Sequence, residues 1–361
     1  MRAQKVYRAI GLMSGTSMDG VDVAMIETNG YDHVRPLEFE TYAYNEEERD
    51  VLRAALKKME CTPEVDEAEK LVTKKHIAAL KVFEAKHSEG EKVDIVGFHG
   101  HTIFHDPARR FTWQIGDAKK LSQDTGHTVI ADLRQADIKS GGQGAPLLPV
   151  YHYALSEEIK KPVAILNIGG VSNITWIGDK EEDMIAFDCG PGNALLDDFV
   201  MDRTGQPFDE HGVLANEGTV FDKAIAEWMS HPYFDQEPPK SLDRDAWVIG
   251  GLSAFSEEDG AANLTAFTVC GIVNAMTHLP EKPLEMYVTG GGRHNLFMMD
   301  SLNKALNIPV KSVEHLGWNG DALEAQGMAY LAVRSQIGEY LTLPGTTGVP
   351  VPMKGGTLYK G

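Results

Sequence analysis

Two glycine-rich segments constrain what this chain can fold into more than any other feature. Residues 9–26 read AIGLMSGTSMDGVDVAMI, and residues 163–178 read VAILNIGGVSNITWIG. In each, an apolar run, a cluster of turn-forming residues and a second β-rich run predict two antiparallel strands joined by a turn. Consecutive backbone N–H groups in such a turn can form an anion-binding concavity. One such hairpin is usually only a turn, but two indicate a duplicated domain that binds a polyphosphate.

Length and charge narrow the class of protein further. A chain of 361 residues exceeds what one hydrophobic core usually supports, so we expect two domains. The net charge of −19 argues against non-specific binding to nucleic acid or to an anionic membrane surface. No apolar stretch approaches the roughly 20 residues of a membrane span, and residues 1–13 lack the pattern of a signal peptide. Three cysteines without a CxxC motif fit a reducing compartment, so we predict a cytoplasmic protein.

Strand and helix patterns alternate along the chain, which predicts an α/β protein with two similar halves. The Gly/Pro-rich stretch 138–150 favours a boundary between domains at 1–140 and 141–361, and the C-terminal tail, which shows no clear element, could return to the first domain. Beyond the hairpins, strands are expected at residues 93–98, 128–132, 184–188 and 285–291. Helices are expected at residues 45–59, 65–87, 117–126, 193–204, 219–229, 261–278 and 321–340.

Asp188 is the main candidate for a catalytic group. An apolar strand ends at this residue, the turn Cys-Gly-Pro-Gly-Asn follows, and a helix begins directly afterwards. In open α/β folds, ligands and catalytic groups gather at the carboxyl ends of strands, and a helix N-terminus favours an anion. Asp188 could therefore serve as a general base. It could equally cap the turn by accepting N–H bonds from Gly190 or Gly192.

Two further groups have both a binding and a structural interpretation. The glycines of residues 289–296 (TGGGRHNL) could admit a flat nucleoside against the backbone, or could simply form a strand-to-helix turn. Asp19 could hold Mg²⁺ beside a phosphate, or could form its own turn. Neither GxxxxGK[ST] nor GxGxxG occurs at these clusters, which weakens the Walker-type and dinucleotide-fold interpretations.

The histidines of residues 98–106 and the charged residues of 131–147 also have more than one interpretation. His99, His101 and His105 lie close together without partners at zinc-site spacings, so sugar-binding or packing roles are favoured over a metal site. Arg134 follows a strand and is a candidate clamp for a carboxylate. An internal ion pair with Asp132 or Asp137 explains it equally well.

Taken together, these motifs resemble the 1,6-anhydro-N-acetylmuramic acid kinases of the sugar kinase, heat-shock ATPase and actin superfamily. The MSGTSMDG block is specific by itself, and the matching blocks span nearly the whole chain. They are residues 11–23, 98–102 (FHGHT), 131–147 (ADLRQADIKSGGQGAPL), 166–175 (LNIGGVSNIT), 187–198 (FDCGPGNALLDD), 289–295 (TGGGRHN) and 320–332 (GDALEAQGMAYLA).

The resemblance implies an actin-like, ribonuclease H-like fold with a duplicated core and ATP in a central cleft. It also implies Mg²⁺, usually a homodimer, and a role in peptidoglycan recycling and amino-sugar catabolism. In the implied reaction, Asp188 deprotonates a water that attacks the anomeric carbon. The O6 released from the anhydro bridge then attacks the γ-phosphate, giving N-acetylmuramic acid 6-phosphate and ADP.

Matching motif positions imply the individual site residues. Asp188 corresponds to the catalytic aspartate, and Asp19 would also contact the magnesium ion. The residues implied around ATP are Gly15, Thr16, Ser17, Asp19, Gly20, Asn167, Gly169, Gly170, Gly290, Gly291 and Gly292. Those implied around the sugar are His99, Asp132, Arg134, Gly190 and Glu324, with Arg134 as the candidate partner of the lactyl carboxylate. Three alternatives remain: a kinase of another anhydro sugar such as levoglucosan, an actin-like ATP-binding module, and a glycosidase that needs no ATP.

Overall fold

A computed structural model describes residues 5–88, 90–242, 247 and 249–361. The chain divides into two compact units, which are treated separately here. The first unit combines Met1–Glu158 with Ala322–Gly361, and the second unit is Ile159–Asp321. Contacts thus place residues 141–158 with the first unit, whereas the sequence suggested a division at residue 140. The last long helix, in addition to the tail, also belongs to the first unit.

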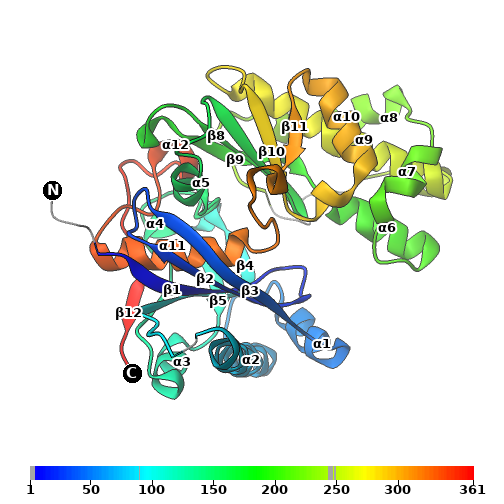
Figure 1. The fold of residues 1–361 in the computed structure, drawn as a ribbon. Coiled ribbons are helices and arrows are strands. Elements are labelled where there is room, and N and C mark those ends of the chain that lie inside the picture. The colour runs from blue at the N-terminus through cyan, green and yellow to red at the C-terminus, as the bar shows by residue number, and fades with distance from the viewer. Residues whose placement is uncertain (1–4, 89, 243–246, 248) are drawn as a thin grey trace. The chain divides into compact units, whose positions relative to one another are not determined.

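The first unit is built on a seven-stranded sheet with the order β12-β6-β4-β1-β2-β3, with β5 paired to β4 (Figure 1). Strands β1, β4 and β6 run parallel, while β2, β3, β5 and β12 pair antiparallel with their neighbours. The predicted first hairpin is β1–β2. The strands are β1 (Tyr7–Ser14), β2 (Gly20–Thr28), β3 (Val34–Ala43), β4 (Ile95–Asp106), β5 (Phe111–Ile115), β6 (Val129–Ala131) and β12 (Thr357–Tyr359).

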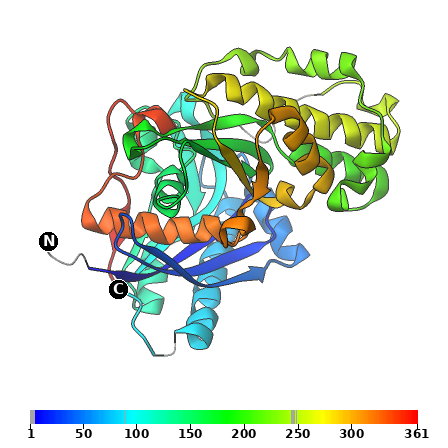
Figure 2. The same ribbon diagram turned by 45° about the horizontal axis from the view of Figure 1, so that its top comes forward.

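Helix α11 packs directly on this sheet, as Figures 1 and 2 show. A Cβ at Gly11 on β1 would overlap the carbonyl oxygen of Ala325, and one at Gly97 on β4 would overlap that of Met328. Glycine at both positions therefore lets the helix backbone lie against the strands. The helices of this unit are α1 (Glu46–Ala55), α2 (Pro63–His87), α3 (Ala118–Thr125), α4 (Gln135–Lys139), α5 (Pro149–Leu155), α11 (Leu323–Ile337) and α12 (Pro344–Thr347).

The second unit repeats the same strand order. Its five-stranded sheet runs β11-β10-β7-β8-β9, with β7, β10 and β11 parallel and β8 and β9 antiparallel. In each unit the first three strands form a meander, and later parallel strands add beside the first. This correspondence confirms the predicted α/β fold with a duplicated, ribonuclease H-like core. The strands are β7 (Val163–Ile168), β8 (Val171–Ile177), β9 (Ile185–Pro191), β10 (Glu285–Thr289) and β11 (Val310–Ser312).

Helix α9 (Glu257–Ala275) forms much of the core of the second unit, with twelve of its residues buried. It packs against β9, α6 (Ala194–Thr204), α7 (Val213–Glu217), α8 (Asp222–Met229) and α10 (Leu296–Leu306). Ser256 caps its start by accepting from the backbone N–H of Asp259. Among the described residues, no helix has the length and apolar character to cross a membrane.

The predicted helices are present with small differences at their ends. Signals in the sequence explain several of those ends: Asn45 and Glu48 form a capping box at α1, and Gly126 ends α3 in a left-handed conformation. The tail differs from the prediction. It contains α12 and the edge strand β12, because Thr357–Tyr359 pair with β6 rather than remain irregular.

Candidate functional site

The turn between β1 and β2 presents its polar groups to solvent. Met18 donates its backbone N–H to the carbonyl of Gly15 at 3.1 Å and adopts a positive φ of 57°. Thr16, Ser17 and Asp19 are exposed. The Ser17 hydroxyl donates to Asp19 Oδ1 at 2.8 Å, and the Gly20 N–H donates to the same oxygen at 3.0 Å. Both interpretations of Asp19 are thus compatible with the structure, since it organises the turn and still faces solvent.

A buried hydrogen-bonded chain lies directly behind this turn. The Ser14 hydroxyl is 3.0 Å from His101 Nδ1 and 3.1 Å from the Tyr44 hydroxyl, and the Tyr44 N–H donates to the Asp19 carbonyl at 3.0 Å. Burial lowers the pKa of His101 to about 4, so its imidazole is neutral near pH 7. His101 is therefore a buried, neutral link between β1 and β4 beneath the turn, which agrees with the packing alternative.

Arg134 and His99 form a second polar group in the first unit. Arg134 donates from Nε to His99 Nε2 at 3.0 Å and from Nη1 to the Gly144 carbonyl at 2.7 Å. Because His99 Nε2 accepts, its proton lies on Nδ1, which faces the Gly100 carbonyl at 3.1 Å. Burial first, and then the positive Arg134, lowers the pKa of His99 to about 3. His99 is consequently a neutral support for the guanidinium.

Glu324 lies in the first turn of α11, next to the point where Gly11 lets that helix approach β1. Burial raises the pKa of its carboxyl group, the charge of Arg134 opposes this, and Asp19 adds to it. Two of the residues implied as site residues, Arg134 and Asp19, thus act electrostatically on a third, Glu324, within the first unit.

Asp132 and Asp137, which the sequence offered as ion-pair partners of Arg134, accept hydrogen bonds from other groups. Asp137 is buried and accepts from Gly144 N at 2.6 Å and from the hydroxyls of Thr342 and Thr347 at 2.5 Å each. Through Gly144, Asp137 shapes the loop whose carbonyl holds Arg134. Asp132 accepts from the Tyr359 hydroxyl at 3.0 Å.

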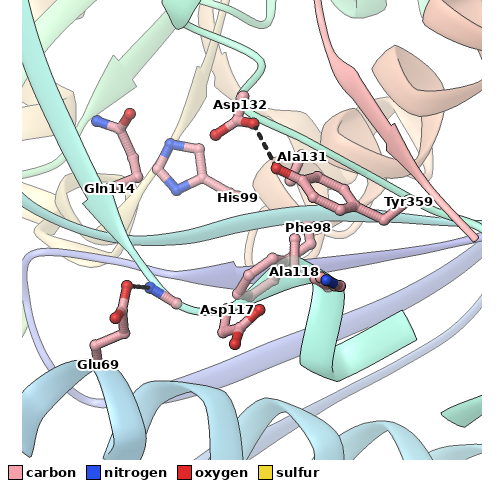
Figure 3. A pocket seen from close by; sticks show the side chains of 11 residues that line it. Glu69, Phe98, His99, Gln114, Asp117, Ala118, Ala131, Asp132 and Tyr359 are labelled. Carbon is pink, nitrogen blue, oxygen red and sulfur yellow. Dashed lines mark hydrogen bonds between the residues drawn. The ribbon is translucent and has the colours of Figure 1, made fainter. Parts of the chain in front are cut away.

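Asp132 also faces a polar pocket of about 240 Å³ in the first unit (Figure 3). In Figure 3, Asp132, His99 and Gln114 surround the same space, while Tyr359 reaches Asp132 from β12. Glu69, from α2, accepts from the Gly116 N–H at 3.4 Å on another wall. This pocket joins two of the implied sugar residues, His99 and Asp132, whereas Arg134 reaches toward Gly144.

In the second unit, the predicted phosphate turn contacts the start of α6. The carbonyl of Gly170 accepts from the N–H groups of Gly192 and Ala194 at 3.0 and 3.3 Å, and the carbonyl of Gly169 accepts from Asn193 N at 2.7 Å. These N–H groups were expected to favour an anion. Those of Gly192, Asn193 and Ala194 donate to carbonyls of the turn, and an anion site at the start of α6 stays a prediction.

The three consecutive glycines after β10 differ in how much space a side chain would have at each position. Gly290 has a φ of 77°, and a Cβ there would overlap Asn167 and Ile168. A Cβ at Gly292 would overlap the Ile168 side chain. At Gly291 the nearest atom would be Asn193 Nδ2 at 3.5 Å, an ordinary contact. Packing on the end of β7 thus explains Gly290 and Gly292, and Gly291 is the position with room beside it.

Asp188 lies within β9, the outer strand of the second sheet, and is 7% exposed. The register shifts here, because Asn173 pairs with Asp188 while Ser172 pairs with Gly190. Cys189 is the extra residue of this β-bulge, a feature that redirects side chains near active sites. The Asp188 carboxylate accepts from the Leu242 N–H at 2.7 Å. This contact differs from the turn-capping bonds that the sequence left open.

The described residues contain no group of three or more His, Cys, Asp or Glu side chains placed to hold a metal ion. Asp19 nevertheless fits Mg²⁺, because this cation usually takes one or two protein carboxylates and completes its shell with water and phosphate oxygens. Asp19 is exposed and adjoins the hydroxyl of Ser17.

Sequence reasoning missed Ser14 and Tyr44 behind the first turn, and Tyr233 and Lys240 beside Asp188. Tyr233 donates its hydroxyl to the Asp188 carbonyl at 2.6 Å, and the Lys240 carbonyl accepts from Asp188 N at 3.0 Å. Ser14 adjoins the conspicuous turn and could have been noticed there. Nothing local marks Tyr233 or Lys240, which lie more than 40 residues after Asp188 in the sequence.

Known proteins of one family match this chain over nearly its whole length. A family model for anhydro-N-acetylmuramic acid kinase matches residues 7–361. The anhydro-N-acetylmuramic acid kinase of Rhizorhabdus wittichii is 47% identical over 98% of this chain and 98% of its own length. The anhydro-N-acetylmuramic acid kinase of Paramagnetospirillum magneticum is 49% identical over 96% of this chain and 98% of its own length. Among solved structures, the chain is distantly similar to the activator of the 2-hydroxyisocaproyl-CoA dehydratase from Clostridium difficile with bound ADPNP. The TM-score is 0.46 and the identity 12%, with 92% of this chain and 96% of that chain covered.

Proposed function

This chain belongs to the anhydro-N-acetylmuramic acid kinase family, and we propose that it opens the 1,6-anhydro ring of that sugar while phosphorylating O6 with ATP. The products are N-acetylmuramic acid 6-phosphate and ADP. The observation that carries this proposal is the family match over residues 7–361, together with relatives of that name at 47–49% identity. The reaction transfers a phosphoryl group to an alcohol oxygen that ring opening itself releases.

Asp188 supplies the general base in this proposal. Its carboxylate takes a proton from water as the water oxygen bonds to the anomeric carbon, and the bond between that carbon and O6 breaks. O6 then bonds to the γ-phosphorus, and the bond to ADP breaks. The first step resembles an inverting glycosidase, in which a carboxylate activates water opposite the leaving group. The bulge at Cys189 and the Leu242 N–H support this role, because together they orient the Asp188 side chain.

The first unit contributes the exposed turn at Gly15–Asp19 to phosphate binding. Its N–H groups and the hydroxyls of Thr16 and Ser17 are suited to phosphate oxygens. Asp19 would hold Mg²⁺, which when bound neutralises charge on the transferred phosphoryl group. In the second unit, Asn167, Gly169, Gly170, Gly290, Gly291 and Gly292 belong to the other nucleotide-contacting segments. Gly291 is the glycine at which a ligand has room to approach.

The sugar is proposed to contact the polar groups of the first unit. Arg134 would bind the lactyl carboxylate, because a guanidinium supported by neutral His99 and by the Gly144 carbonyl is held in a fixed orientation. Asp132 and Glu324 supply hydrogen-bonding groups for hydroxyls. The sugar contact that the resemblance implies for Gly190 stays a prediction, because this glycine is buried against Phe234.

Replacing Arg134 with Met tests the identity of the sugar. We expect the KM for 1,6-anhydro-N-acetylmuramic acid to rise about 10- to 100-fold, because a charge-assisted pair to the carboxylate is lost. The KM for levoglucosan, which has no lactyl group, would stay within about twofold. An unchanged KM for the muramic substrate would remove the lactyl assignment.

The reaction itself is tested in ¹⁸O-labelled water with mass spectrometry of the sugar. A phosphorylated product that carries the label at its anomeric hydroxyl, when sampled before exchange, supports coupled hydrolysis and phosphorylation. Labelled, unphosphorylated sugar formed without ATP would instead identify a glycosidase. ATP hydrolysis indifferent to sugar would identify an actin-like ATP-binding module.

We propose peptidoglycan recycling in the cytoplasm as the setting of this activity, because the substrate is a cell-wall fragment. A homodimer is the expected assembly from the family resemblance. Light scattering coupled to size-exclusion chromatography would measure a mass near twice that of the 39.6 kDa chain if this holds.

A further inference from the structure

Three residues that hydrogen-bond to Asp188 in the second unit come from one distant segment, Tyr233–Leu242. Strand β9 ends the order of its sheet, so one edge of the strand has no neighbouring strand. At this edge the N–H of Asp188 donates to the Lys240 carbonyl at 3.0 Å. The segment therefore takes the place that a further strand would occupy, and it does so at the candidate base.

Three contacts from this segment reach three different groups of Asp188. Besides the bond to Lys240, the Tyr233 hydroxyl donates to the Asp188 carbonyl at 2.6 Å, and the Leu242 N–H donates to Oδ2 at 2.7 Å. The backbone is thus held on both sides of the Cα atom, and the side chain is held at its end. Backbone position and carboxylate rotation are fixed together.

Tyr233 and Lys240 also hold each other. The Lys240 ammonium donates to the Tyr233 carbonyl at 3.2 Å, and its nitrogen lies 4.8 Å from the centroid of the Tyr233 ring. The two residues are only 4% and 5% exposed. Burial and then the nearby Asp188 raise the pKa of Tyr233, so its hydroxyl remains protonated and donates. Burying an amine costs free energy, which makes this position unusual for a residue with only a packing role.

We propose that Tyr233 and Lys240 are positioning residues that fix the Asp188 carboxylate for proton abstraction. The inference rests on the proposed function, because it takes Asp188 to be the base. Tyr233 binds the strand directly, and Lys240 holds Tyr233 while its own carbonyl binds the Asp188 N–H. Together they bring the Leu242 N–H to the carboxylate. Neither side chain needs to contact the sugar or ATP.

The first test compares Tyr233→Phe with Tyr287→Phe in the complete enzyme. Tyr287 is a buried tyrosine of the same unit whose hydroxyl donates to Glu285, so its removal is a matched control. We expect kcat to fall about 10- to 100-fold in Tyr233→Phe, since small misplacements of catalytic groups have effects of this size. The KM values for ATP and for the sugar would stay within about threefold. The control would keep kcat within about twofold.

A double-mutant cycle with Asp188→Asn separates positioning from general damage. If Tyr233 acts through Asp188, adding Tyr233→Phe to Asp188→Asn lowers kcat by less than about twofold. A further loss as large as that of the single variant would overturn the inference, as would a normal kcat for Tyr233→Phe. Substantial turnover of Asp188→Asn alone would instead overturn the proposed function, so the two failures are distinguishable.

Lys240→Met provides a second, independent variant of similar volume. It keeps the backbone carbonyl that binds Asp188 but removes the ammonium that holds Tyr233. We expect a kcat loss of about 3- to 30-fold with unchanged KM for ATP, again absent in the Asp188→Asn background. A folded Lys240→Met enzyme with wild-type kcat would exclude the lysine from the positioning role, and this result remains accessible even if Tyr233→Phe does not fold.

Discussion

The two hairpins have the same place in their sheets, yet they use their polar groups differently. In the first unit, the turn between β1 and β2 leaves Thr16, Ser17 and Asp19 exposed. In the second unit, the carbonyls of Gly169 and Gly170 accept from the N–H groups of Gly192, Asn193 and Ala194, where α6 begins. The duplicated strand order therefore does not imply duplicated chemistry. The first turn exposes Thr16, Ser17 and Asp19, and the second, which is exposed at Gly170, also organises the strand-to-helix connection that follows Asp188.

The difference extends to the acidic residues nearby. Asp19 belongs to the open turn and has hydroxyl and N–H partners within that turn. Asp188 is nearly buried and is held by a segment far away in the sequence. An exposed carboxylate is suited to binding a hydrated cation. A buried carboxylate in a fixed orientation is suited to act as a general base. The comparison supports the proposal that Asp19 holds the cation and that Asp188 abstracts the proton.

The largest expected effect comes from Asp188→Asn. Because removal of a general base costs roughly 10²–10⁴-fold, kcat should fall by at least that range. The affinity for ATP, measured by calorimetry, should change by less than about threefold. Near-normal turnover would show that Asp188 has only a structural role. The proposed difference in function between Asp19 and Asp188 would then be wrong.

Gly11→Ala and Gly291→Ala contrast a packing glycine in the first unit with an open one in the second. The new methyl group at residue 11 would overlap the α11 backbone, so we expect a loss of unfolding free energy of about 3 kcal/mol or more. At residue 291 the nearest atom is 3.5 Å away, so the loss should be below about 1 kcal/mol. Urea denaturation measures both. Equal losses would show that the close approach of α11 to β1 is not what constrains residue 11.

Asp19→Asn tests the open turn. We expect the apparent affinity for Mg·ATP to fall about 10- to 100-fold, because a carboxylate ligand to the cation is lost. Raising the Mg²⁺ concentration should restore part of the activity, a rescue not expected for Asp188→Asn. The diagnostic measurement is kcat/KM for ATP as a function of free Mg²⁺. Identical magnesium curves for wild type and Asp19→Asn would contradict the metal assignment.

Acidification should lower the folding stability of the first unit before that of the second. Each histidine contributes less to this effect than the substitutions above are expected to cost. All five histidines whose pKa values burial lowers to about 3 or 4 lie in the first unit: His76, His99, His101, His105 and His152. The unfolded chain, with histidine pKa values near 6.5, binds protons first, so stability is lost as pH falls from about 6.5 toward 4. Each group contributes at most about 1.4 kcal/mol per pH unit.

Hydrogen exchange followed by mass spectrometry at pH 7.5 and 5.5, corrected for intrinsic exchange rates, resolves the two units. We expect exchange protection to decrease more in β1, β4 and α11 than in β7, β8 and α9. A larger decrease in the second unit would show that other groups dominate the acid response.

The sequence was most informative where structure depends on neighbouring residues. The hairpins and the helix from Pro63 to His87 were predictable, because turn residues, an N-cap and apolar periodicity lie within each segment. Strand β12 was not, since Thr357–Tyr359 become a strand only by pairing with β6. Likewise, the sequence did not show that Gly11 is needed for the close approach of α11 to β1. Such pairings depend on residues hundreds of positions apart.

The candidate site follows the same pattern. Asp188 and Asp19 were identifiable because each lies beside a conspicuous turn. Tyr233 and Lys240 were not, because their contact with β9 depends on the course of an irregular segment. Arg134 was identified, but its support by His99 required the strands to be in place. Sequence patterns thus pointed to candidate reacting groups more readily than to the residues that contact and orient them.

The discontinuity of the first unit affects how the protein is made. Helix α11 and strand β12, which lie against β1, β4 and β6, come from the last forty residues of the chain. A ribosome therefore completes Ile159–Asp321 while the earlier sheet still lacks the helix that covers it. The second unit, which is continuous in sequence, can fold as soon as it has been synthesised, whereas the first also needs the residues that follow Asp321. Until then, β1 and β4 lack the helix that packs against them.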